Sequence, residues 1–187
     1  IAGQRFAASG TPAGGEFAVS STDPQYQEWP AVAADADGDF VVAWARQGAN
    51  GSDSFWGVQA RRFAAGGTPA GAAFQVNTFT SSFQRLPAIA SDPEGDFVVV
   101  WQSVGSAGND NSEYSVQGQR YTSAGTATGG EFQVNTYTSS FQSTAAIGAG
   151  GDGSFVVAWD SMGSGEGDNS ETSVHAQRFS AAGVAQA

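Results

Sequence analysis

The sequence predicts an all-β protein, and its composition carries much of that prediction. Good helix formers are scarce among the 187 residues: Leu86 is the only leucine, Met162 is the only methionine, and lysine is absent. Glycine occurs 26 times, which disfavours long helices. The 13 phenylalanines and the many valines favour strands and provide apolar side chains for a sheet core. We therefore expect an ordered β-sheet protein and neither a helical bundle nor a disordered chain.

The chain is also a tandem repeat with a period of 57 to 58 residues. Trp44, Trp101 and Trp159 recur at this spacing, and the segments 74–84 and 132–142 differ at a single position, which indicates duplication. We therefore expect one domain, 1–187, made of about three repeats. Its units are a partial one at 1–20, two complete ones at 21–77 and 78–135, and one at 136–187 that lacks its last strand.

Each unit has the pattern of four short strands in a fixed order. In the unit at 21–77, the first strand is expected at Pro30–Ala34, before a tight Gly/Asp turn. The second strand, Phe40–Trp44, is apolar throughout, which predicts burial on both faces. A polar loop leads to an alternating third strand at Gly57–Phe63, and a second hairpin leads to the fourth strand at Ala73–Asn77.

Four-stranded antiparallel units repeated in tandem are typical of β-propeller blades. A three-fold closed fold, such as a β-prism or β-trefoil, is the alternative, and a β-solenoid fits less well because its coils are shorter. Propellers close with about four to eight blades, whereas this chain has about three repeats. We therefore expect further repeats of the same chain, or other copies of it, as partners.

The repeat resembles a known class of modules. The pattern EFQVNTYTSSFQ at Glu131–Gln142, a DG turn followed by FVVVWQS at Phe97–Ser103, and VQGQRY at Val116–Tyr121 resembles tandem repeats of large secreted or cell-surface bacterial proteins. The resemblance covers nearly the whole chain. It implies export, a propeller-like or related β-repeat fold, and a role in adhesion, surface structure or ligand display. We therefore expect a non-catalytic structural or adhesive module that is extracellular or at the cell surface.

The charge excludes some partners. With 18 acidic residues against 7 basic ones, the net charge is −11, so binding to nucleic acid or anionic membranes is disfavoured. No apolar run reaches the roughly 20 residues that span a bilayer. Cysteine is absent, which excludes disulfides and thiolate sites.

The loop between the second and third strands is a candidate calcium site. Closely spaced carboxylates in a Gly- and Asn-rich loop are the oxygen ligands that Ca²⁺ prefers. The same residues are also ordinary turn formers, and no EF-hand motif is present. The candidate ligands are Asp53, Asp110, Glu113, Asp168 and Glu171.

Two residues at the end of this loop, Trp56 and Tyr114, are candidate ligand-binding residues for an alternative function, a lectin-like propeller with one glycan site per blade. The third repeat has Thr172 near that position, which argues against equivalent sugar sites. The recurring tryptophans are expected in the core. The arginines Arg5, Arg62, Arg120 and Arg178 share one repeat position, where we expect them to hold strands together through carbonyls or acids.

Catalysis has little support in the sequence. His175 is the only histidine, and glutamines occupy its place in the two preceding repeats. No GxSxG motif occurs, and no pair of acids stands apart from the repeat. Because the distinctive residues recur in every unit, the sequence favours a structural or binding role over an enzyme, with no catalytic residue.

Overall fold

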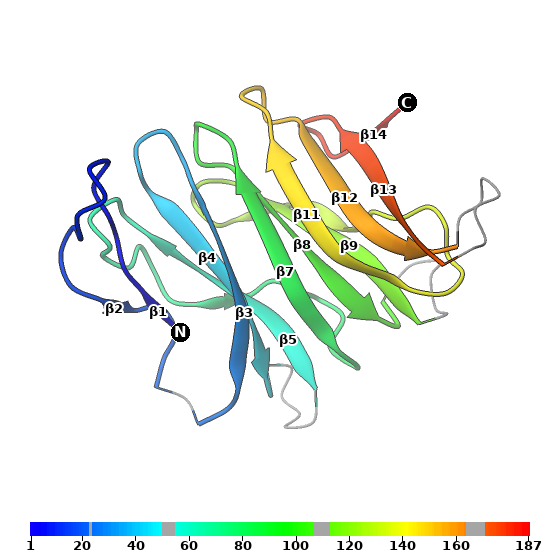
Figure 1. Cartoon of the computed structure of the whole chain (residues 1–187), viewed down its shortest axis with the longest axis horizontal. Coiled ribbons are helices and arrows are strands. Elements are labelled where there is room, and N and C mark those ends of the chain that lie inside the picture. Colours follow the sequence, from blue (N-terminus) through cyan, green and yellow to red (C-terminus); the bar gives the residue numbers. More distant parts are fainter. Residues whose placement is uncertain (23, 50–54, 107–112, 164–170) are drawn as a thin grey trace.

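The computed structural model describes residues 1–22, 24–49, 55–106, 113–163 and 171–187. These residues form strands and no helix. Three four-stranded antiparallel sheets and a two-stranded sheet, β1–β2, lie side by side (Figure 1). The strands are β1 Ala2–Gly3, β2 Phe17–Ala18, β3 Gln27–Ala34, β4 Phe40–Gln47, β5 Trp56–Phe63, β6 Phe74–Gln75, β7 Gln84–Ser91, β8 Phe97–Val104, β9 Tyr114–Tyr121, β10 Ala127–Gln133, β11 Gln142–Ala149, β12 Phe155–Met162, β13 Thr172–Phe179 and β14 Ala185–Gln186.

Each four-stranded sheet is one repeat, and we call it a blade. The third blade includes the two-residue strand β14, although we expected the last unit to lack its fourth strand. The strand orders are β3-β4-β5-β6, then β7-β8-β9-β10, then β11-β12-β13-β14. The first strands of the blades, β3, β7 and β11, lie beside one another (Figure 1), so they are the inner strands of the array. The propeller-like fold is therefore confirmed. The three blades form an open array without a closed ring, unlike a three-fold prism or trefoil.

The core lies between the blades. The second strand of the middle blade, β8, contributes to both interfaces: Val99 packs toward the first blade and Val100 toward the third. Both valines are fully buried, as is Trp101. The prediction that this apolar strand is covered on both faces is confirmed, because alternate side chains of a strand point to opposite faces.

The recurring arginines connect neighbouring blades. The first three of the four donate a hydrogen bond from the guanidinium to a carbonyl in the outer hairpin of the following blade, which confirms that carbonyls are their partners. Such charge-assisted bonds are among the stronger ones in proteins. The three bonds run from Arg5 to Ala65 at 2.6 Å, from Arg62 to Ser123, and from Arg120 to Ala181 at 2.6 Å.

Close packing accompanies these bonds. Gly183 has φ +77°, and a Cβ atom there would lie 2.7 Å from Nε of Arg120. Only glycine combines this positive φ with the absence of a Cβ atom that would clash with Arg120.

No helix among the described residues is long and apolar enough to cross a membrane.

Candidate functional site

The inner strands share an irregularity near their first residues. The pairing of β3 with β4 shifts between Glu28 and Ala31, and β7 and β11 show the same shift in their blades. Each bulge contains a non-glycine residue with positive φ: Trp29 at 53°, Leu86 at 52° and Thr144 at 52°. This conformation is uncommon for non-glycine residues and a clear outlier for a β-branched one. Bulges of this kind redirect side chains and are frequent beside functional sites.

The sequence did not predict this feature, because we expected the strand to begin at Pro30. In the structure, β3 begins three residues earlier, at Gln27. The additional residues form one end of the array, which we call the bulge rim. It comprises the first three residues of β3, β7 and β11, the ends of the paired strands β4, β8 and β12, and the aromatic residues packed against them.

The bulge rim breaks the symmetry of the repeat. One position holds Glu28, Arg85 and Ser143 in the three blades, and the residues paired with them across the sheet are Ala45, Gln102 and Asp160. An acid, a guanidinium and a hydroxyl therefore replace one another at the first position, and a methyl group, an amide and an acid do so at the paired position. Unlike groups gathered on a repeated scaffold are the arrangement that a specific binding or catalytic site requires.

A hydrogen-bonded network connects two blades at this rim. Arg85 donates from Nε to Oε1 of Gln102 at 2.8 Å, and Gln102 donates from Nε2 to Oγ of Ser143 at 2.7 Å. Arg85 also donates from Nη2 to the Tyr114 hydroxyl at 3.0 Å, and its guanidinium lies 5.2 Å from that ring centre. The network holds Arg85 between two partners and so restricts the orientation of its guanidinium.

Aromatic pairs flank the network. Trp29 lies 5.0 Å from Trp56, measured between ring centres, and Tyr114 stacks on Phe141 at 5.2 Å. Trp29 and Phe141 are 36% and 37% exposed, so each pair presents an aromatic surface to solvent. Tryptophan and tyrosine combine an apolar face with a polar edge, which suits a ligand that has both kinds of surface.

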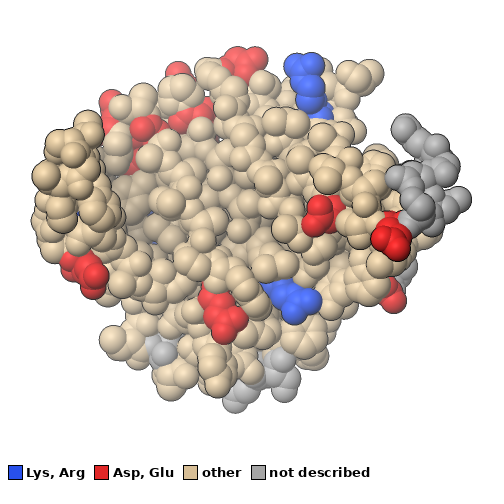
Figure 2. Space-filling model, in the orientation of Figure 1, with Lys and Arg blue, Asp and Glu red and all other residues tan. Residues whose placement is uncertain are grey.

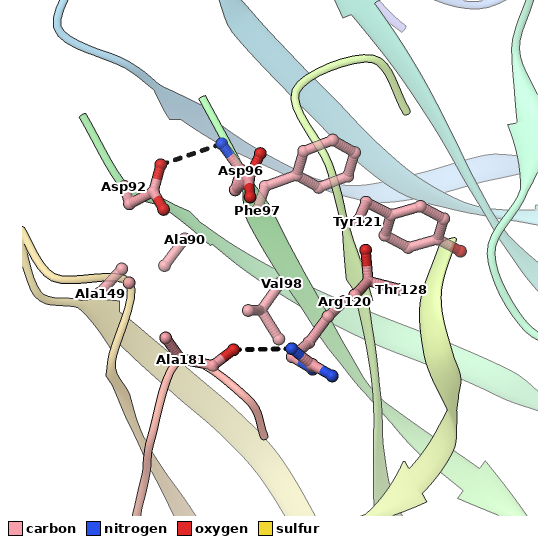
Figure 3. A pocket seen from close by; sticks show the side chains of 11 residues that line it. Ala90, Asp92, Asp96, Phe97, Val98, Arg120, Tyr121, Thr128, Ala149 and Ala181 are labelled. Carbon is pink, nitrogen blue, oxygen red and sulfur yellow. Dashed lines mark hydrogen bonds between the residues drawn. The ribbon is translucent and has the colours of Figure 1, made fainter. Parts of the chain in front are cut away.

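The opposite end of the array is structural. A small cavity of about 80 Å³ between the second and third blades is lined by Asp92, Asp96 and Arg120, and the arginine bonds the Ala181 carbonyl (Figure 3). A cavity of about 60 Å³ lies at the equivalent place between the first two blades. Because the arrangement repeats, we assign it to inter-blade packing.

In Figure 2, acidic side chains follow the upper edge of the molecule, and much of the rest of this face is uncharged.

The residues predicted from sequence fall into two groups. Trp56 and Tyr114 lie at the bulge rim, where both are half-buried and belong to the aromatic pairs. Both begin strands, although we expected them to lie in loops.

The proposed calcium ligands Asp53, Asp110 and Asp168 lie outside the described residues, while Glu113 and Glu171 are described and exposed. Among the described residues, no three acidic or histidine side chains come together. Calcium binding therefore stays a prediction.

Sequence reasoning missed Glu28, Trp29, Arg85 and Ser143. The signal was present in the repeats themselves, because Gln27, Gln84 and Gln142 align while the two residues after each of them differ.

Comparison with solved structures places this array in a class, the repeated-blade, propeller-like proteins. No protein-family model and no curated sequence matches the chain. The structures that resemble it include a protein of unknown function from Dyadobacter fermentans, with a TM-score of 0.62 and 11% identity over 89% of this chain. An α-L-arabinofuranosidase from Lactobacillus brevis has a TM-score of 0.55 and 13% identity over 94% of the chain. An endo-arabinase from Bacteroides thetaiotaomicron has a TM-score of 0.53 and 15% identity over 91%.

The chain spans only part of these structures: 54%, 58% and 62% of their respective lengths. At such low identity the likeness shows the fold alone.

The expectation of a non-catalytic structural or adhesive module is nevertheless wrong. The proteins that share the fold include an arabinofuranosidase, an endo-arabinase and an exo-1,5-α-L-arabinanase, all of which are enzymes. The sequence argument failed because it looked for symmetry-breaking residues in motifs and loops, and the structure shows them at the inner-strand bulges.

Proposed function

We propose that this chain is the glycan-binding part of a carbohydrate-active propeller that hydrolyses pentofuranose polysaccharides of the arabinan type. The observation that carries the proposal is the bulge rim, where exposed aromatic pairs flank the network of Arg85, Gln102 and Ser143. The arabinan-directed activities of the fold neighbours support the choice of substrate class.

The chemistry of the bulge rim matches a sugar chain. A furanose ring has apolar C–H surfaces, which pack on aromatic rings, and hydroxyl groups, which need donors and acceptors. Trp29 and Trp56 come from the first blade, whereas Tyr114 and Phe141 connect the second blade to the third. An extended oligosaccharide that crosses the inner strands would therefore meet two aromatic surfaces with the Arg85 network between them.

Hydrolysis of a glycosidic bond commonly requires two carboxyl groups, one acting as an acid and the other as a base or nucleophile. The bulge rim offers Glu28 on β3 and Asp160 on β12, and neither residue has a carboxylate at its position in the other blades. We propose these two as the first catalytic candidates among the described residues.

We also propose that the protein works outside the cell, where plant-type polysaccharides are encountered. The resemblance of the repeat to modules of large secreted bacterial proteins supports this location. The acidic, lysine-free and cysteine-free composition is compatible with it.

Calorimetric titration with linear arabino-oligosaccharides tests the binding proposal. We expect Trp29→Ala and Arg85→Ala each to weaken binding at least tenfold, because one removes the aromatic surface and the other removes the fixed guanidinium. Phe6→Ala is the matched control, since Phe6 is an exposed aromatic residue remote from the rim in sequence and in the fold. Absence of binding, or equal affinity in all variants, contradicts the proposal.

Release of reducing ends from arabinan tests the catalytic half. Asp160→Asn and Glu28→Gln should each reduce the rate at least a hundredfold while leaving oligosaccharide affinity within about threefold. An unchanged rate in both variants removes these residues from the mechanism.

A further inference from the structure

The first blade carries an apolar groove on its outer face. The groove has a volume of about 530 Å³ and lies between the β1–β2 sheet and the strands β3 and β4. Figure 1 shows the dark-blue strands β1 and β2 on the same side of the array as β3 and β4. Side chains that line it include Ile1, Phe17, Val19, Val32, Phe40 and Val42.

The same position is filled in the next blade. Val32 is 64% exposed, whereas Ile89, its counterpart one repeat later, is only 9% exposed. Ile89 belongs to a core cluster with Val41 and Ala43, which lie on the second strand of the preceding blade. Ile147 in the third blade packs likewise against the cluster that contains Val98 and Val100. A second strand with small apolar side chains therefore covers this position wherever it is buried.

The β1–β2 sheet reproduces the outer half of a blade. Val19 donates its backbone N–H to the Ile1 carbonyl, as Val76 does to Val58 in the first blade. Phe17 and Phe63 pack at 5.5 Å between ring centres, as Phe74 packs against Tyr121 at 5.4 Å. The two sheets therefore correspond residue for residue, and the groove lies where an inner pair of strands belongs.

One edge of β1 is open. In the first blade, Gln59 and Ala60 pair with β6 on one side and with Trp44 and Ala43 of β4 on the other. Their counterparts Ala2 and Gly3 pair with β2, and within the described residues no strand pairs with their other edge. An open edge beside an apolar groove is the geometry of β-strand addition.

We propose that this groove binds a β-hairpin of the repeat's own first-and-second-strand type, which adds to the open edge of β1. The incoming second strand would align its Ala43-like residue with Gly3 and its Trp44-like residue with Ala2, as in the register of β4 with β5. Its Val41-like and Ala43-like side chains would then cover Val32. A complete blade from a second copy does not fit, because β1–β2 already occupies the place of that blade's outer strands.

A synthetic peptide with the sequence of residues 27–47 is the probe, because it contains both strands and their Gly/Asp turn and carries acidic residues for solubility. We expect it to bind the 187-residue chain in calorimetric titration. We also expect slower hydrogen exchange at the Ala2 amide when it is bound, because this N–H points to the open edge whereas the neighbouring Gly3 pairs with Phe17 of β2.

Val32→Asp tests the groove itself, since a charge on its floor should weaken peptide binding at least tenfold. The variant should fold normally because the position is already exposed. Val174→Asp, at an exposed valine of the third blade, is the matched control and should leave the affinity unchanged. A peptide carrying V41D and A43D should also fail to bind.

Three outcomes overturn the proposal: no binding of the peptide, equal binding to Val32→Asp, or no protection of the Ala2 amide. Sedimentation of the chain alone adds a fourth. If the chain forms a dimer, and if Val32→Asp and Val174→Asp each dissociate it, then a second copy of the chain occupies the groove and the proposal is wrong.

Discussion

Val116 and Val174 occupy the same position in consecutive repeats, yet Val116 is fully buried and Val174 is 75% exposed. The difference comes from the neighbour: the middle blade is covered by the third, whereas no described blade covers the outer face of the third. A blade therefore buries its apolar residues only with the help of the next one. As in other repeat proteins, stability is expected to be a sum of blade and interface contributions.

The strongest test of this comparison is to truncate both valines. We expect Val116→Ala to lower the free energy of unfolding by about 2 kcal/mol, because it removes two buried carbon groups and leaves a cavity. Val174→Ala should change it by less than about 0.5 kcal/mol. Urea denaturation measures both, and equal losses would mean that the face of the third blade is covered in solution.

The inter-blade arginines give a smaller contrast. Arg120→Gln removes a charged hydrogen bond to the Ala181 carbonyl and should cost about 1 kcal/mol. At the equivalent place in the third blade, Arg178 has no following hairpin to bond within the described residues, so Arg178→Gln should cost less than about 0.5 kcal/mol. Thermal unfolding of the two variants under identical conditions measures the difference, and a larger loss for Arg178→Gln contradicts the assignment.

Tyr121 provides the last contrast, which is absent at neutral pH and appears only as an alkaline pH dependence. Burial raises the pKa of its phenol well above the ordinary value of 10.0, and the charge of Glu131 raises it further. Above pH 10 the unfolded chain loses this proton while the folded protein retains it, so stability should fall as the pH rises. The slope is at most about 1.4 kcal/mol per pH unit for one proton.

Tyr121→Phe should remove that alkaline loss. The change is structurally mild, because Phe63 and Phe179 occupy the equivalent positions in the other blades. Denaturation curves at pH 8 to 11 give the free energy of unfolding of the two proteins. If this free energy falls equally with pH in both, Tyr121 is not the source of the alkaline loss.

The fold could be predicted because its signals are local. The apolar run at Phe97–Trp101 indicates a doubly buried strand whatever its neighbours are, and the Gly/Asp turns define the hairpins. The partner of Arg120 could not be predicted, since its bond to Ala181 depends on the packing of two blades that lie about sixty residues apart in sequence.

The candidate site was harder to predict because it depends on a backbone irregularity. Trp29 and Arg85 lie before the residues with a strand-like pattern, and a period-two analysis does not detect a bulge. Trp56 and Tyr114 were selected as aromatic loop residues. The network that connects Tyr114 to Ser143 could not be predicted, because it joins residues that are far apart in sequence and meet only in the folded protein.

The bulges also bear on how such a protein can change over generations. The φ angles at Trp29, Leu86 and Thr144 agree within one degree, although the side chains share neither size nor polarity. The backbone conformation was thus kept after duplication, while substitution changed the side chain at this position. A position that accepts an indole, an isobutyl group and a hydroxyl on one backbone can diverge without loss of the fold, so new ligand preferences can arise there blade by blade.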